Sequence, residues 1–392
     1  MNKYTKLISI LICTLFSVHA LRAQSQDSTT VTSNKNLRFS IMGGPGYTPD
    51  YGFLIGGASL FTFSMDPKDA NLQRSVVPLS FGLTFAKPIG INVMIKPQLF
   101  FKKDRIRLFG SFIFKNINEN YYGVGYGTNK HTERSEATTQ YSNSSYIINP
   151  ILMFRLKDTP FYVGPMVDYI HERITNPGTF LSNDPLYQSQ GGDSTGIMLQ
   201  SVGIGATLSY DTRDVAANAY KGIYFEFKAA YYPTFFGSDF EFGSISFDYR
   251  QYKALPRLGE RRVLTWNVAS KNIFGDAPFS RYPLVGSPFD LRGYYVGQYR
   301  NRSTLFGLAE YRHMFNFGRE TRTRRFFSRF GFAAWAGMGA MGGNPVKYEA
   351  VLPNFGAGLR IELQPRMNFR LDIGHSPIDK QTLIYFNMTE AF

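Results

Sequence analysis

Apolar and polar residues alternate with a period of two along most of the chain. In SFGLTFA, Phe81, Leu83 and Phe85 share one face of an extended segment, while small and polar residues occupy the other. The alternation recurs in GIYFEFKAAYY, RIRLFGSFIF, VLTWNVA, FRLDIG and LIYFNM. Because successive side chains of a β-strand point to opposite faces, this pattern predicts strands with one apolar and one polar face.

Sixteen strands are expected, an even number as in single-chain bacterial barrels. They commonly span 10 to 15 residues, whereas a tilted strand needs about 9 to 11 residues to cross a bilayer and soluble strands average about 5 to 6. The pattern favours a transmembrane antiparallel β-barrel over a soluble β-protein, which also alternates. The expected strands are 37–46, 52–64, 74–86, 90–103, 105–117, 141–157, 159–173, 196–212, 219–233, 240–254, 261–274, 302–316, 327–341, 354–363, 367–375 and 381–391.

The connections and strand ends support the same fold. The longest gaps, 118–140, 174–195 and 275–301, are where extracellular loops are expected. Tyrosine pairs such as Tyr121 and Tyr122 lie at strand ends, as in the aromatic girdles of membrane barrels.

The N-terminus has the features of a secretory signal peptide, residues 1–23. Lys3 and Lys6 precede the apolar run 7–18, and small residues follow. A polar lead-in, 24–36, would then precede a barrel of residues 37–392. The single cysteine, Cys13, falls within the signal, so the mature chain is expected to form no disulfide. No later apolar stretch approaches the roughly 20 residues of a membrane-spanning helix.

The net charge bears on the partners. The formal charge is +14, and without Lys3, Lys6 and Arg22 the 40 basic and 29 acidic residues leave +11. For an exported chain we expect outer-membrane lipids and the phosphates of lipopolysaccharide as partners, and no nucleic acid. Basic residues scattered over loops and a polar lumen would account for the excess equally well.

The segment FDLRGYYVGQYR, residues 289–300, places an arginine and a glycine between aromatic residues. Together with Gly203–Phe227, Leu305–Phe315 and the C-terminal NFGAGLRIELQPRMNFRLDIG and IYFNMTEAF, it resembles the BamA/TamA-type outer-membrane assembly factors, the bacterial surface antigen family. The resemblance implies a sixteen-stranded barrel whose sixth extracellular loop folds into the lumen.

In that family an Arg-Gly-aromatic motif holds the folded-in loop. The match implies that Arg292, Gly293 and Tyr294 form the motif and that Glu310 is the acidic partner on the following strand. A guanidinium in a lumen of reduced dielectric needs acceptors in fork geometry, so such a pair can fix a long loop. A tight turn beside an aromatic girdle is the alternative interpretation of LRGYY.

Two features depart from the family. In the family, a second acidic partner of the loop arginine lies in a strand with the pattern Phe-x-x-Asp-x-Gly. The matching segment here is FAAWAG, which has Trp335 in place of the aspartate. Arg292 could then pair with Glu310 alone, pair with Asp372 of RLDIG, or stack on Trp335 through a cation–π contact. Also, about a dozen residues stand where the family carries POTRA repeats, so a barrel-only member is expected.

The resemblance predicts a barrel that assists insertion or translocation of proteins or lipids at the bacterial outer membrane. Client outer-membrane proteins and periplasmic accessory proteins are the implied partners. The mechanism would use a weak seam between the first and last strands. Gly43 and Gly44 in the first strand and Glu390 near the C-terminus are candidate seam weakeners, and Phe386, Met388 and Phe392 are expected on one apolar face of the last strand.

The sequence also bears on two other function classes. A passive pore or structural surface barrel with a loop-plugged lumen is the alternative to an assembly factor. An enzyme is not expected: His131, His171, His313 and His375 lie in no recognised nucleophile or metal motif, and GxSxG, HExxH and CxxC are absent. No metal or cofactor is expected either.

Overall fold

Seventeen strands form one antiparallel sheet in the computed structural model, which describes residues 36–69, 72–85, 89–216, 218–318, 320–364 and 366–392. All described strands belong to the unit Leu37–Phe392. The predicted signal peptide and nearly all of the lead-in lie outside the described residues. The sheet strands are β1 Arg38–Thr48, β2 Gly52–Phe63, β3 Ser75–Thr84, β4 Gly90–Ile95, β5 Gln98–Phe101, β6 Ile106–Asn120, β7 Gln140–Arg155, β8 Phe161–Thr175, β9 Gly196–Asp211, β10 Gly222–Tyr232, β11 Phe242–Ala254, β12 Arg262–Gly275, β15 Ser303–Met314, β16 Phe330–Gly342, β17 Ala350–Gln364, β18 Met367–Ser376 and β19 Gln381–Met388.

Each strand pairs with its neighbours along the chain. The ladders run without exchange of order from β1 to β19. β4 and β5 both pair with β3 and β6, so they are two segments of one strand position, interrupted at Lys96 and Pro97. Proline lacks the N–H that a ladder requires, which weakens pairing at Pro97. Pro78 and Pro150 nevertheless lie within β3 and β7, so proline alone does not account for the break. The predicted strand 90–103 is therefore present as two shorter strands, β4 and β5, that share one position in the sheet. The exact number of strands in the barrel stays a prediction.

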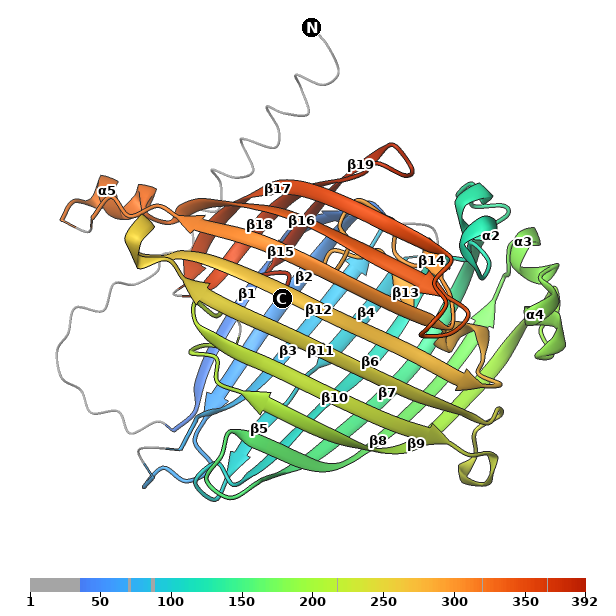
Figure 1. The fold of residues 1–392 in the computed structure, drawn as a ribbon, viewed down its shortest axis with the longest axis horizontal. Coiled ribbons are helices and arrows are strands. Elements are labelled where there is room, and N and C mark those ends of the chain that lie inside the picture. Colours follow the sequence, from blue (N-terminus) through green and yellow to red (C-terminus); the bar gives the residue numbers. More distant parts are fainter. Residues whose placement is uncertain (1–35, 70–71, 86–88, 217, 319, 365) are drawn as a thin grey trace, which may run out of the picture. The chain divides into compact units, whose positions relative to one another are not determined.

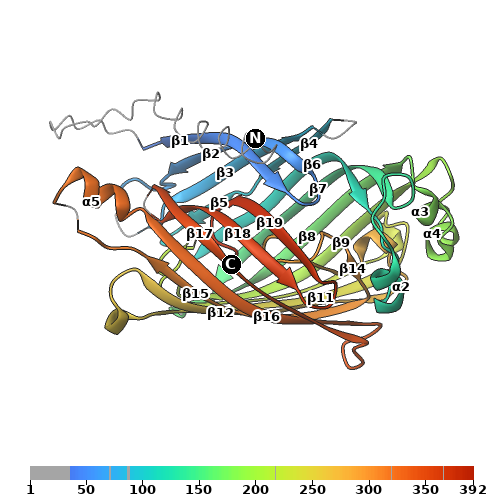
Figure 2. The ribbon, with the colours of Figure 1, turned by 90° about the horizontal axis from the view of Figure 1, so that it is seen from above.

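The connections differ at the two ends of the strands. Alternating direction places the segments 121–139, 176–195, 233–241 and 276–302 at one end, here called the long-loop end. This end carries the short helices α2 (Tyr126–His131), α3 (Thr179–Ser182) and α4 (Pro185–Ser189) (Figure 1). The other, short-turn end carries α5 (Arg322–Phe327), and a second view keeps α5 opposite the other three (Figure 2).

The burial of side chains is inverted relative to a soluble protein. On β8, Phe161, Val163 and Val167 are exposed, while Asp168 and Glu172 are buried. β12 repeats this arrangement, with an exposed apolar face and a buried polar face. Soluble proteins bury apolar surface, so exposed apolar bands around a polar interior indicate that lipid surrounds this sheet.

The fold class predicted from the sequence is confirmed: the described part of the chain is nearly all-β, with few and short helices, and has one large antiparallel sheet. The two terminal strands, β1 and β19, lie beside each other, which brings the sheet back upon itself as a barrel. Among the described residues, no helix combines the length and the apolar character needed to span a bilayer.

Candidate functional site

The connection between β12 and β15 turns back against the inner face of the barrel. We call residues 284–300 the inner loop. Its ends pair through the short strands β13 (Leu284–Val285) and β14 (Tyr299–Arg300). Buried side chains of the loop and of the barrel wall form one apolar cluster, made up of Val285, Leu291, Tyr294, Tyr299, Leu308, Trp335, Met341, Leu352, Ala391 and Phe392.

Arg292, at the tip of the inner loop, is fully buried. One terminal nitrogen, Nη2, lies 2.5 Å from Glu310 Oε2 on β15, and Nη1 lies 2.8 Å from Asp372 Oδ2 on β18. The guanidinium carbon is 3.5 Å from the ring centre of Trp335 on β16. The three contacts that the sequence offered as alternatives therefore occur together, and Arg292 bridges three strands. In a buried site such charge-assisted, stacked geometry favours arginine over lysine.

The main chain of the loop tip is held by hydrogen bonds from the barrel wall. Asn354 Nδ2 donates to the carbonyl oxygen of Arg292 (2.9 Å), and Gln381 Nε2 donates to that of Gly293 (2.8 Å). The Tyr385 hydroxyl accepts a hydrogen bond from the Gly293 N–H (2.9 Å) and donates to the Tyr294 carbonyl (3.1 Å). Strands β17 and β19 thus supply partners for polar main-chain groups that would be costly to bury alone.

Two glycines allow this close approach. Gly293 has a φ of +119°, and a Cβ there would lie 2.8 Å from the main-chain carbon of His375. On the facing strand, a Cβ on Gly374 would lie 2.6 Å from the main chain of Arg292. Any side chain at either position would push the loop away from β18.

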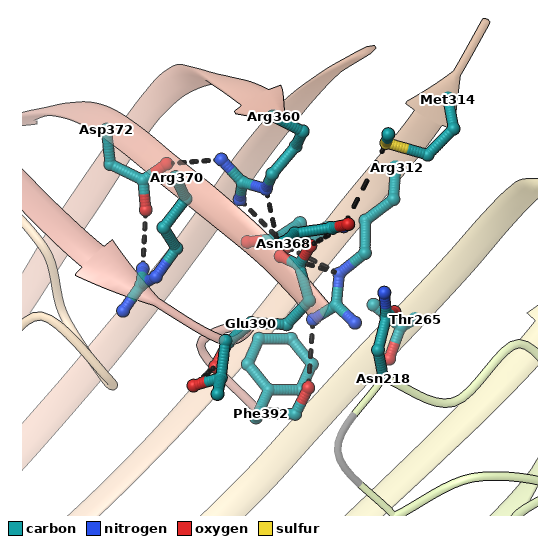
Figure 3. Close-up of polar contacts among 12 residues, drawn as sticks. Asn218, Thr265, Arg312, Met314, Arg360, Asn368, Arg370, Asp372, Glu390 and Phe392 are labelled. Carbon is teal, nitrogen blue, oxygen red and sulfur yellow. Dashed lines mark hydrogen bonds and ion pairs between the residues drawn. The ribbon is translucent and has the colours of Figure 1, made fainter. Parts of the chain in front are cut away.

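A larger ion-pair network extends from Asp372 towards the short-turn end (Figure 3). Asp372 accepts from Arg360 Nη1 at 2.6 Å and from Arg370 Nη1 at 2.5 Å, in addition to Arg292. Arg370 also donates to the carbonyl oxygen of Pro288 in the inner loop (2.7 Å). Arg360 continues to Glu390 Oε2 at 2.9 Å. Because opposite charges alternate along this row, each buried charge has a counter-charge, which offsets part of its desolvation cost.

The segment after β19 differs from the expectation. β19 ends at Met388, and Thr389 has a φ of +71°, so Phe392 does not continue the outward face of the last strand. Phe392 is instead buried in the apolar cluster, and its carbonyl oxygen accepts from Arg312 Nη2 at 2.9 Å. Glu390, expected to weaken the seam, is a buried partner of Arg360 and of Asn368 Nδ2 (2.7 Å).

The remaining seam residues lie in regular strands. Gly43 pairs with Gly57 and Gly44 with Gly56 in an uninterrupted β1–β2 ladder. Phe386, on β19, pairs with Leu371 and contacts Phe369. Among the described residues, no ladder joins β1 to β19, although the two strands lie beside each other.

Three further residues of the site, Arg360, Arg370 and Gly374, were not singled out from the sequence. The sequence contained a signal for Gly374. FRLDIG (Phe369–Gly374) has the same Phe-x-x-Asp-x-Gly spacing as FAAWAG, and it supplies the aspartate and the glycine that contact the loop. The second acidic partner, Asp372, thus lies on β18, and β16 contributes the indole of Trp335.

The arrangement is suited to fixing a loop. The charged side chains that meet Arg292 are fully buried and engaged with one another. Within the described part of the chain, no group of three or more His, Cys, Asp or Glu side chains could hold a metal ion.

The fold and this site define a class: a transmembrane antiparallel β-barrel whose interior holds a loop fixed by a buried arginine. The comparison with protein families then names the family. The Omp85 superfamily domain matches residues 69–392, so the chain belongs to the Omp85 superfamily, whose barrel fold implies the outer membrane.

Solved structures agree on the fold. BamA from Haemophilus ducreyi lacking POTRA domains 1–3 aligns with a TM-score of 0.60 at 12% identity, covering 90% of this chain and 70% of that one. CdiB from Escherichia coli aligns with a TM-score of 0.57 at 10% identity, covering 92% of this chain and 63% of that one. CdiB from Acinetobacter baumannii aligns with a TM-score of 0.51 at 12% identity, covering 91% of this chain and 60% of that one. A comparison with curated proteins gives no match.

Proposed function

We propose that this chain assists insertion or translocation of proteins or lipids at the outer membrane, with the seam between β1 and β19 as the place of entry. The observation that carries the proposal is the seam itself. Every other pair of adjacent described strands is joined by a ladder, whereas β1 and β19 lie together without one. An unpaired strand edge presents N–H and C=O groups that an incoming strand can pair with.

The inner-loop anchor supports this mechanism. Its partners lie on β15 to β19, the part of the wall that ends at the seam. A loop that fastens these strands together stiffens one side of the seam. Among the described residues, β1 forms a ladder only with β2, and the β1–β2 turn meets the loop through the hydrogen bond between Asp50 and Val296. Opening would then separate β1 from a rigid wall instead of distorting the whole barrel.

The expected partners follow from this location. Clients would be outer-membrane proteins arriving with unpaired strands, assisted by periplasmic accessory proteins, and the lipids would be those of the outer membrane, including lipopolysaccharide. The proposal involves no nucleic acid, catalytic residue, metal or cofactor. The signal peptide of residues 1–23 would deliver the chain.

Depletion of the protein in its native cell tests the proposal. We expect specific outer-membrane proteins or lipids to fall in abundance or to accumulate before insertion, as measured by quantitative proteomics and lipid analysis of isolated outer membranes. A wild-type copy should restore the inventory, and an equally abundant Arg292→Ala copy should restore less of it. An inventory unchanged by depletion contradicts the proposal.

A passive or structural barrel remains the second candidate. The buried inner loop and its apolar cluster favour a structural barrel with a loop-plugged lumen over an open pore, because they fill interior space that an open pore would need. For such a barrel, depletion would change permeability or surface properties and leave the assembly of other outer-membrane proteins intact.

A further inference from the structure

The turn between β15 and β16 combines positive charge with exposed aromatic side chains. Residues 315–329 contain five arginines and one glutamate. Arg322, Arg324 and Arg325 of α5 are exposed. The same helix ends with Phe326 and Phe327, which are 50% and 52% exposed.

The aromatic residues continue from the lipid-facing surface of the barrel. Tyr311 and His313 on β15 and Phe332 on β16 point outward, and the His313 and Phe332 rings stack at 4.9 Å. Phe315 and Phe317 extend this row into the turn, with ring centres 5.5 Å apart. Aromatic rows of this kind mark the level of the membrane–water interface.

The turn has a defined structure. Arg261 donates from Nη1 to the carbonyl oxygen of Ser328 (2.6 Å) and pairs through Nη2 with Glu362 (2.7 Å). The Ser328 hydroxyl accepts from the N–H of Phe317 (2.9 Å). The Thr321 side chain caps α5 by accepting from the N–H of Arg324 (3.2 Å). These contacts hold α5 at the end of β15 and β16, opposite the long-loop end (Figure 1).

We propose that this segment, the α5 patch (residues 315–318 and 320–329), binds the headgroups of anionic glycerophospholipids in the leaflet at the short-turn end. Arginine forks match phosphate oxygens in geometry and charge, and the adjacent phenylalanines can insert among acyl chains. The only acidic side chain of the segment, Glu320, is exposed and pairs with Arg324 at 3.3 Å, which leaves a strong positive excess. The inference requires a membrane-spanning barrel and is independent of any assembly activity.

Lipid retention by the purified full-length protein tests the site. Detergent-solubilised protein would be incubated with equal amounts of phosphatidylglycerol and phosphatidylethanolamine, and the retained lipids measured by native mass spectrometry. We expect wild type to prefer phosphatidylglycerol and R322Q/R324Q/R325Q to lose about threefold or more of that preference, because basic residues at the surface attract anionic lipids.

A matched control removes three exposed charges elsewhere at the same end. K102Q/K103Q/R105Q, in the turn between β5 and β6, should keep the wild-type preference, because the turn itself, residues 102–105, contains no aromatic residue to insert beside those charges. Raising the salt concentration should reduce the wild-type preference towards that of the α5 variant, which tests the same point without a substitution.

Three outcomes would overturn the inference: equal retention by wild type and R322Q/R324Q/R325Q, an equal loss in the control variant, or displacement of phosphatidylglycerol by lipopolysaccharide at the α5 patch. If R322Q/R324Q/R325Q instead loses binding to an acidic soluble protein while it retains lipid as wild type does, the patch binds a protein partner.

Discussion

At the scale of single residues, Arg292 combines a positive charge with complete burial. Its terminal nitrogens are engaged by Glu310 and Asp372, and its flat face lies on the Trp335 ring. Removing one member of a buried ion pair leaves its counter-charges uncompensated, so the effect exceeds the strength of any single contact.

Arg292→Ala should therefore lower the free energy of unfolding by about 3 to 5 kcal/mol. Arg292→Lys should lie between this variant and wild type, because lysine keeps the charge and loses both the fork and the stacking. Denaturant unfolding in detergent, followed by tryptophan fluorescence, measures the difference. Arg105→Ala is the control, because Arg105 is exposed and its ion pair with the likewise exposed Asp158 is long, at 3.6 Å. A loss of equal size in this control would refute the anchoring role of Arg292.

A second residue gives the inner loop a pH dependence. Asp50, in the turn between β1 and β2, accepts a hydrogen bond from the Val296 N–H at 2.8 Å. Burial raises the pKa of its carboxyl from 3.8 to about 6, opposed by that hydrogen bond and by Arg134. The folded state then binds more protons than the unfolded state between about pH 4 and 6, so this contribution to stability is present at low pH and is lost as pH rises through 6.

Protease sensitivity of the inner loop should accordingly rise from pH 5 to pH 7.5, apart from the protease's own pH dependence. Asp50→Asn should flatten this rise, because the amide cannot ionise. A cleavage-rate profile of the two proteins, each divided by the rate on an unstructured peptide, gives the comparison. Parallel profiles would show that Asp50 does not titrate in this range.

The limits of prediction from sequence are also clearest at the residue scale. Resemblance indicated Arg292 and Glu310 because a motif and a neighbouring strand carry them. Arg360 and Arg370 were not foreseen, because a charged residue on the polar face of a strand looks the same whether it meets solvent or a counter-ion. Which charges meet is decided by the register of β15, β17 and β18 and by the path of the loop between them.

At the scale of elements, period-two alternation located the strands because it survives errors of a few residues at their ends. The alternation did not predict two places where a strand is interrupted or ends. One expected strand is interrupted at Lys96 and Pro97 and forms β4 and β5, and the turn at Thr389 ends β19 before the apolar pattern does. Both are local events that leave the alternation of faces unchanged.

The seam gives a prediction for β1 and β19. Each has a ladder on one side only among the described residues, whereas strands such as β7 and β8 have two. We expect amides of β1 to exchange with solvent deuterons at least about tenfold faster than those of β8, because local opening needs fewer broken hydrogen bonds. Hydrogen-exchange mass spectrometry in lipid nanodiscs measures this, with β8 as the internal reference.

β19 should behave differently from β1 in the same experiment. Tyr385 and Gln381 on β19 are bonded to the inner loop, so its amides should be protected more than those of β1. Arg292→Ala should remove that difference. Equal exchange of β1, β19 and β8 in wild type would contradict both the weak seam and the stiffened wall.

At the scale of the whole molecule, the position of the inner loop leads to a prediction about conduction. Its buried side chains join strand residues in one apolar cluster inside the barrel, which we expect to obstruct the passage of ions. We expect the wild-type protein to conduct weakly in planar bilayers. Replacing residues 286–298 with a short Gly-Ser linker should raise the single-channel conductance several-fold, because the apolar side chains that exclude water are removed.

The same linker in place of residues 343–349 is the matched control, since that connection is exposed at Val346 and lies at the same end of the barrel. It should leave the conductance unchanged. High conductance in the wild type, unaltered by loss of the inner loop, would mean that the loop does not block the pore. That result would favour a passive channel over a barrel that works at its seam, because an open lumen would already connect the two sides of the membrane.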